Sequence, residues 1–124
     1  MNRFEKWSEE KLLYRCVISA ADIGDNIEDP YKRVYTPGFN LDNEFGIRIN
    51  NNTILHGINS YKELIGLKII GINFNVKDKF IKFSFEDSKS ITVDMSDNGF
   101  NGPEAIIIQK DFEIMVIGDI GDIE

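Results

Sequence analysis

Apolar and polar residues alternate regularly along three segments in the second half of the chain. Successive side chains of a strand point to opposite faces, so this period of two predicts half-buried antiparallel strands. The breaks at 75–78 and 87–89 are short enough for hairpin turns, which predicts a meander. The apolar members of the three segments are Ile70, Ile72 and Phe74; Ile81, Phe83 and Phe85; and Ile91, Val93 and Met95.

Two further segments, 105–109 and 114–117, are almost continuously apolar and flank a polar stretch at 110–113. The polar stretch predicts a hairpin loop. Strands without alternation are typical of positions buried on both faces. We therefore expect these two strands to lie centrally in the sheet or beneath a covering element.

The first sixty residues are less regular. Phe4 and Trp7 lie three residues apart ahead of a polar run, and this spacing predicts a short N-terminal helix. A strand is expected near 11–18, with Cys16 and Ile18 on its apolar side. Residues 21–41 contain prolines, glycines and acids and predict one long loop, which is often functional at this length.

Three shorter features complete the first half. The segments 44–49 and 53–56 read as a hairpin across the asparagines at 50–52. Residues 60–66 predict one helical turn that ends at its glycine. The fold class that follows is α+β and mainly β, in a single domain over 1–124. It comprises an antiparallel meander sheet, open or partly closed into a barrel, with its core at 64–118.

The composition agrees with a folded domain. The chain has 124 residues, of which 42% are hydrophobic, and a chain of this mass buries about 67% of its unfolded surface. No apolar run approaches the roughly 20 residues of a membrane span, and residues 1–19 lack the features of a signal peptide. Cys16 has no second cysteine to pair with, which fits a reducing compartment. We expect a cytoplasmic protein.

Charge gives the main functional indication. The chain carries 21 acidic and 14 basic residues, a net charge of −7, which argues against direct nucleic-acid binding. The acids gather in loops and are interleaved with tyrosines, which are favoured interface anchors. This pattern predicts recognition of a basic partner, although it also fits a solvated surface. The candidate partner-binding residues are Asp22, Asp25, Glu28, Asp29, Tyr31, Tyr35, Asp94, Asp97 and Glu104.

Catalytic and metal-binding patterns are weak. Cys16 and His56 could form a nucleophile and base, but a buried strand cysteine and a strand-end histidine explain the two residues better. One histidine and one cysteine cannot make a closed zinc site. Residues 94–99 match part of a calcium loop, but Ala105 stands where the bidentate glutamate belongs. We expect no metal, no cofactor and no enzymatic activity.

A resemblance adds a function. The segment Leu64-Ile65-Gly66, the alternating strands and the turn Asn101-Gly102-Pro103-Glu104-Ala105 resemble bacterial toxin-immunity proteins, including those of contact-dependent growth inhibition. The resemblance implies a small cytoplasmic protein that covers the active site of a toxin nuclease.

The expected partner is therefore a basic cognate toxin, with no direct nucleic acid and no membrane. We expect a monomer or a weak homodimer. The alternative is a small β-rich enzyme or ligand-binding domain that uses Cys16 and His56 or a pair of carboxylates.

Overall fold

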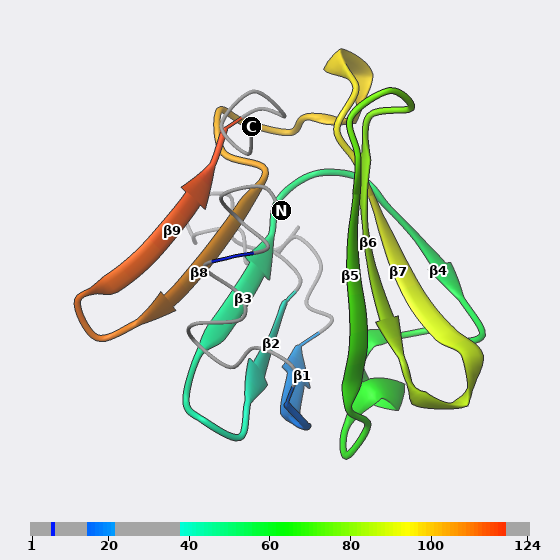
Figure 1. The fold of residues 1–124 in the computed structure, drawn as a ribbon, viewed down its shortest axis with the longest axis vertical. Helices are drawn as coiled ribbons and strands as arrows, with labels where there is room; N and C mark the ends of the chain where they lie inside the picture. The colour runs from blue at the N-terminus through cyan, green and yellow to red at the C-terminus, as the bar shows by residue number, and fades with distance from the viewer. Residues whose placement is uncertain (1–5, 7–14, 22–37, 119–124) are drawn as a thin grey trace, which may run out of the picture.

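A computed structural model of the chain describes residues 6, 15–21 and 38–118. Within them the chain is mainly β, as predicted, and its helices are short 3₁₀ turns (Figure 1). The strands are β1 (Val17–Ala21), β2 (Gly38–Leu41), β3 (Gly46–Ile49), β4 (Thr53–His56), β5 (Ile69–Asn75), β6 (Phe80–Phe85), β7 (Lys89–Asp94), β8 (Ile106–Lys110) and β9 (Glu113–Ile117). The 3₁₀ helices are η1 (Tyr61–Leu64), η2 (Glu86–Ser88) and η3 (Asp97–Gly99).

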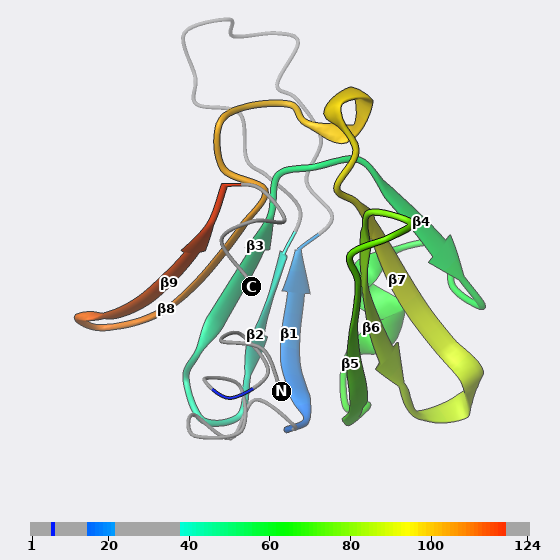
Figure 2. The same cartoon turned by 45° about the horizontal axis from the view of Figure 1, so that its top comes forward.

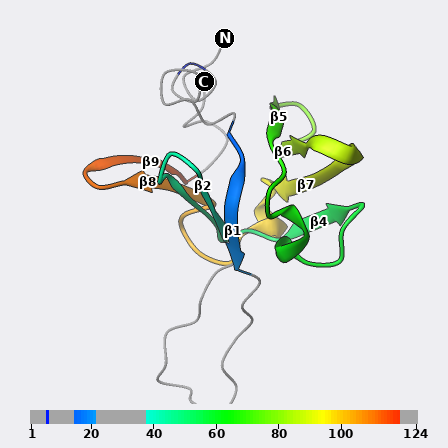
Figure 3. The same cartoon turned by 90° about the horizontal axis from the view of Figure 1, so that it is seen from below.

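The strands form two open antiparallel sheets rather than one meander. The five-stranded sheet has the order β1-β2-β3-β8-β9, and the four-stranded sheet has the order β4-β7-β6-β5. Figures 2 and 3 show the two sheets facing each other, with β1 and β5 at their common corner. The predicted meander is confirmed as β5, β6 and β7, and the predicted hairpin over 110–113 is confirmed as β8 and β9.

The hairpin predicted across residues 50–52 is wrong. β3 pairs with β2 and β8, whereas β4 pairs with β7 in the other sheet. The three residues between them carry the chain from one sheet to the other. A short connection allows either arrangement, and the crossing lets both strands turn an apolar side toward a shared core.

Part of the predicted long loop is a strand of the core. β2 occupies 38–41, and its Phe39 and Leu41 are buried. The ring of Phe39 meets the rings of Phe83 and Phe85 edge-on, with centroids 6.2 and 5.8 Å apart. Phe39 therefore joins the two sheets at the centre of the core. The remainder of that predicted loop, 22–37, lies outside the described residues.

The inner faces of both sheets contribute to one apolar core. The alternation predicted for the second and third meander strands is confirmed, because all six of their apolar residues are buried. The best-buried aliphatic contributors are Val17, Leu41, Ile47, Ile49, Ile106, Ile108 and Ile117 from the five-stranded sheet, and Ile69, Ile81, Ile91 and Val93 from the four-stranded sheet.

The face predicted for β1 is wrong, and the face predicted for β5 is wrong at Ile70; each strand contains a β-bulge. In β1 the buried residue is Val17, whereas Ile18 is 52% exposed and Cys16 is only partly buried. In β5 Ile69 is buried and Ile70 is 62% exposed, whereas Ile72 is buried and Phe74 packs partly buried against the core, as predicted. A bulge places two residues opposite one, so strict alternation fails across it, as between the buried Ile69 and the buried Ile72 of β5. In β1 the core side is the one that carries Val17, opposite to the predicted side.

Both bulges lie where the two sheets meet. Cys16 bridges Lys68, just before β5, and the Val17 amide donates to the Leu67 carbonyl at 2.9 Å. β1 thus continues the hydrogen bonding from one sheet toward the other. Strands commonly use bulges to turn such corners. The predicted strand near 11–18 is therefore shifted, since β1 begins at Val17 and residues 7–14 are not described.

The prediction that both late strands are buried on two faces is wrong. β8 lies between β3 and β9, but β9 is the last strand of the described sheet. Ile114 and Val116 of β9 are 52% and 37% exposed. A continuous apolar run does not distinguish double burial from a strand whose outer face is also apolar.

The remaining helical predictions differ in outcome. The turn at 60–66 is confirmed as η1, and the chain leaves it through Gly66 at a φ of +86°. The predicted N-terminal helix falls in 1–14, almost wholly outside the described residues. Among the residues that are described, none belongs to a helix with the length and apolar character needed to cross a membrane.

Candidate functional site at the junction between the sheets

The predicted partner-binding residues fall into two groups. The first group lies within 22–37, outside the described residues: Asp22, Asp25, Glu28, Asp29, Tyr31 and Tyr35. The chain leaves the described part at Ala21 and re-enters it at Gly38, and these two residues are paired with each other. Gly38 is also paired with Arg48, two residues before the chain crosses at Asn50.

The second group lies on the other connection between the sheets. Asp94, Asp97 and Glu104 belong to the segment that carries the chain from β7 to β8. This segment and the crossing at 50–52 lie at the same end of the molecule, as Figure 2 shows. The structure thus brings the attachment points of the first group and the whole second group to one end.

Backbone hydrogen bonds hold the two crossings side by side. The Asn50 amide donates to the Ala105 carbonyl at 2.8 Å, and the Asn52 amide donates to the Gly99 carbonyl at 2.8 Å. In return, the Asp94 amide donates to the Asn52 carbonyl at 2.9 Å. The crossings therefore continue the hydrogen bonding of both sheets beyond the ends of their strands.

Asparagine side chains reinforce this arrangement. The amide nitrogen of Asn50 donates to the Glu104 carbonyl at 2.9 Å. The amide nitrogen of Asn101 donates to the Asn50 carbonyl at 2.9 Å and to Oδ1 of Asn52 at 3.0 Å. A carboxamide both donates and accepts, which suits a place where two irregular backbones meet. We call Asn50, Asn51, Asn52 and Asn101 the asparagine junction.

Asn51 is the buried member of the asparagine junction. Its side chain is 5% exposed in a residue type that is usually on the surface. Its amide nitrogen donates to the Asp94 carbonyl at 2.8 Å and approaches the sulfur of Met95 at 3.7 Å. Removing that donor would take a hydrogen bond from a partly buried carbonyl, which typically costs about 1 kcal/mol.

The acids of the second group have different roles. The Asp94 carboxylate accepts from the Ser96 amide at 2.8 Å and from the Ser96 hydroxyl at 2.6 Å, so it shapes the turn into η3. Asp97 and Glu104 are exposed. Of the three acids, Asp97 and Glu104 are the ones whose carboxylates face solvent at the asparagine junction.

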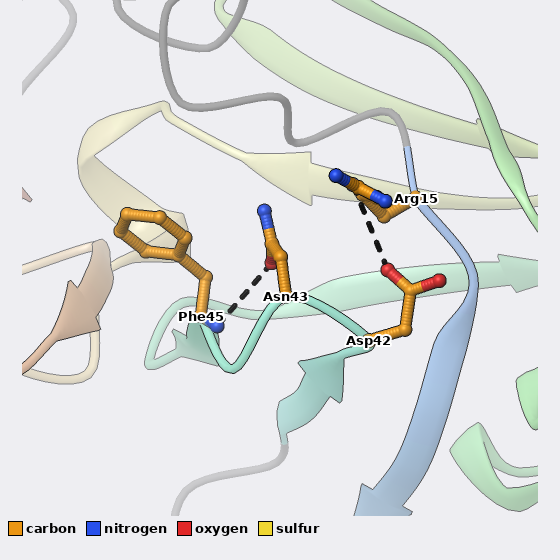
Figure 4. Close-up of polar contacts among 4 residues, drawn as sticks. All are labelled: Arg15, Asp42, Asn43 and Phe45. Atoms are coloured by element: carbon orange, nitrogen blue, oxygen red, sulfur yellow. Dashed lines mark hydrogen bonds and ion pairs between the residues drawn. The ribbon is translucent and has the colours of Figure 1, made fainter.

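The turn between β2 and β3 lies at the opposite end, and its acids do not join this group. Figure 4 shows Nε of Arg15 3.8 Å from a carboxylate oxygen of Asp42. The Phe45 amide donates to Oδ1 of Asn43 in the same turn at 3.4 Å. An ion pair this exposed contributes little stability. The Asp42 carboxylate thus has a local partner in Arg15 and lies apart from the second group.

Hydrogen bonds to the backbone lower the pKa of the Glu63 carboxyl. Its carboxylate accepts the backbone amides of Asn59 and Ser60, the latter at 3.0 Å. These bonds favour the charged form and lower the pKa of Glu63. Glu63 lies in η1, between β4 and β5 and away from the asparagine junction.

The structure does not bring Cys16 and His56 together. Cys16 bridges the residue before β5, and His56 ends β4, at opposite edges of the four-stranded sheet. Three strand spacings separate these edges, about 14 Å. Within the described ranges, no three histidine, cysteine, aspartate or glutamate side chains are grouped as metal ligands would be. The Asp94 carboxylate of the partial calcium pattern instead binds Ser96.

The sequence predictions missed the asparagines. The signal was present as three consecutive asparagines at 50–52 and as two Asn-Gly pairs, which we interpreted only as turns. Their role depends on two segments about fifty residues apart lying side by side, and no local pattern reports that contact.

Comparisons with known proteins add no family. No protein-family model, no curated protein and no solved structure matches the chain.

Proposed function

We propose that this chain is an immunity-type protein that neutralises a basic bacterial toxin, a nuclease, by covering its active site. The observation that carries the proposal is that the two ends of the first acidic segment, Ala21 and Gly38, lie at the same end of the molecule as the second acidic segment and the asparagine junction. Ala21 and Gly38 anchor the first segment beside the crossing that holds the second. An acidic surface raises the encounter rate with a basic partner and disfavours partners of the wrong charge.

The rigidity of the segment that carries Asp97 and Glu104 supports the same proposal. The exposed carboxylates of Asp97 and Glu104 stand on a segment fixed by hydrogen bonds to the neighbouring crossing. Fixed groups lose less conformational entropy on binding than mobile ones. In this mechanism the carboxylates occupy positions where the toxin expects phosphates, and Tyr31 and Tyr35 supply apolar anchors.

The proposal includes a cytoplasmic location, where a nuclease toxin meets its substrate, and no direct contact with nucleic acid or membrane. It also includes a monomeric or weakly dimeric state. In a dimer, the edge at β9 would make the contact, because Ile114 and Val116 are exposed there. Sedimentation at increasing protein concentration measures this state, and a tight dimer would contradict it.

The test is co-expression with the C-terminal domain encoded by the adjacent upstream reading frame. We expect this chain to restore growth and to form a complex that survives size-exclusion chromatography at low salt. Raising the salt from about 50 mM to about 500 mM shortens the range of charge interactions, so association should slow. The proposal would be refuted if co-expression did not restore growth and no complex formed at low salt.

A further inference from the structure

Two Asn-Gly pairs lie on the segment between β7 and β8, and their surroundings differ. They are Asn98-Gly99 and Asn101-Gly102. An asparagine before glycine is open to intramolecular attack, in which the following backbone nitrogen bonds to the side-chain carbonyl carbon. Glycine allows this approach because it has no Cβ to obstruct it. The surroundings of each pair therefore decide whether it reacts.

The first pair is held in an unreactive arrangement. The Gly99 amide donates to the Ser96 carbonyl at 2.9 Å, so its nitrogen is engaged within η3. Gly99 is buried, and a Cβ built on it would lie 2.5 Å from Asp94. Its carbonyl also accepts the Asn52 amide. Attack on Asn98 would require this turn to break and the Gly99 peptide to rotate in a filled space.

The second pair is open. Asn101 and Gly102 are both exposed, and no atom lies within 4 Å of the position that a Cβ on Gly102 would take. Among the described residues, no hydrogen bond from the Gly102 amide is found. The amide side chain that would react is the one that donates to Asn50 and Asn52 across the asparagine junction.

We propose that Asn101 is a site of spontaneous deamidation whose product loosens the asparagine junction. The Gly102 nitrogen gives its proton to solvent and bonds to Cγ of Asn101. The bond from Cγ to Nδ2 then breaks, and ammonia leaves. Water opens the resulting five-membered imide to an aspartyl or isoaspartyl residue. The net change consumes one water and releases one ammonia, with no oxidant or reductant.

The product replaces a hydrogen-bond donor at position 101 by an acceptor. A carboxylate at position 101 has no N–H to donate, whereas the Asn50 carbonyl and Oδ1 of Asn52 are both acceptors. Two hydrogen bonds are therefore replaced by contacts between oxygens. The same change adds one negative charge near Glu104, so the net charge goes from −7 to −8. Deamidation thus weakens the asparagine junction and makes its end of the molecule more acidic.

The first experiment incubates the full chain in mildly alkaline buffer and follows both pairs by peptide mass spectrometry. We expect Asn101 to convert at least about tenfold faster than Asn98. Asn101 has only to release two exposed side-chain hydrogen bonds, whereas Asn98 requires the buried turn around Gly99 to open. In urea-unfolded chain the two rates should become similar. Equal rates in the folded protein, or conversion at Asn101 only in the unfolded chain, would overturn the proposal.

Variants separate the reaction from its consequence. Gly102→Ala should slow conversion at Asn101, because its Cβ obstructs the approach of the residue-102 nitrogen to Cγ. The space around Gly102 admits the methyl group without a clash. Asn101→Asp imitates the product and should speed hydrogen exchange at the Asn52 amide, with Asn98→Asp as the matched control. Exchange that is no faster in Asn101→Asp than in Asn98→Asp would contradict the loosening.

Discussion

At the scale of single residues, the side chains that hold this protein together are few and come from unexpected places. Phe39 lies in a stretch that reads as a loop, yet it is 3% exposed and meets aromatic rings of β6. Asn51 is polar and is also buried, and its side-chain amide nitrogen donates to the Asp94 carbonyl. Residue type alone predicts neither position, since burial depends on which strands face each other.

Phe39→Ala should destabilise the protein by about 3–5 kcal/mol, because it removes a large buried ring and leaves a cavity between the sheets. The free energy of urea unfolding measures the loss. Phe112→Ala is the matched control, since Phe112 is fully exposed and its truncation should change stability by less than about 0.5 kcal/mol. Similar losses in the two variants would contradict the central role of Phe39.

At the scale of elements, hydrogen bonding outside the strands determines where the chain turns. The two bulges let β1 and β5 meet at the corner between the sheets. The short helix η1 begins where the Glu63 carboxylate binds two preceding backbone amides. Such local bonds satisfy the amides that a helix start leaves without intrahelical partners.

Glu63→Gln should make stability less dependent on pH in the acidic range. The pKa of Glu63 is lowered by folding, so its charged form stabilises the native state above the ordinary glutamate pKa, about 4.3. That contribution is lost as pH falls through the folded-state pKa. The difference in unfolding free energy between wild type and variant should therefore be largest near pH 7 and shrink below about pH 4.3. A constant difference down to pH 3 would argue against this role.

At the scale of the whole molecule, β7 and β8 carry acidic residues at both of their ends. Asp97 and Glu104 lie on the connection between the end of β7 and the start of β8, at the asparagine junction. Asp87 lies before β7 and Asp111 after β8, so both stand at the far ends of those strands. The molecule thus has two pairs of acids of equal charge, one at the asparagine junction and one at the opposite ends of the same two strands.

This arrangement provides a matched test of the proposed binding surface. Asp97→Asn with Glu104→Gln should slow association with the toxin domain by roughly tenfold at low salt. Asp87→Asn with Asp111→Asn removes the same charge, from −7 to −5, and should have a much smaller effect. Both control positions have a positive φ, which asparagine tolerates. Equal slowing would mean that net charge, and not this surface, drives association.

The sequence by itself determined the mainly β character, the β5-β6-β7 meander, the β8–β9 hairpin and the turn at η1. Each of these rests on local alternation or on turn chemistry that neighbouring residues supply. Tertiary structure alone decided that β3 and β4 belong to different sheets, that β2 enters the core, and that Val17 and Ile69 are buried while Ile18 and Ile70 are exposed. It also decided that the asparagines of 50–52 and 101 meet. Those outcomes depend on contacts between distant segments, whose energies no local period encodes.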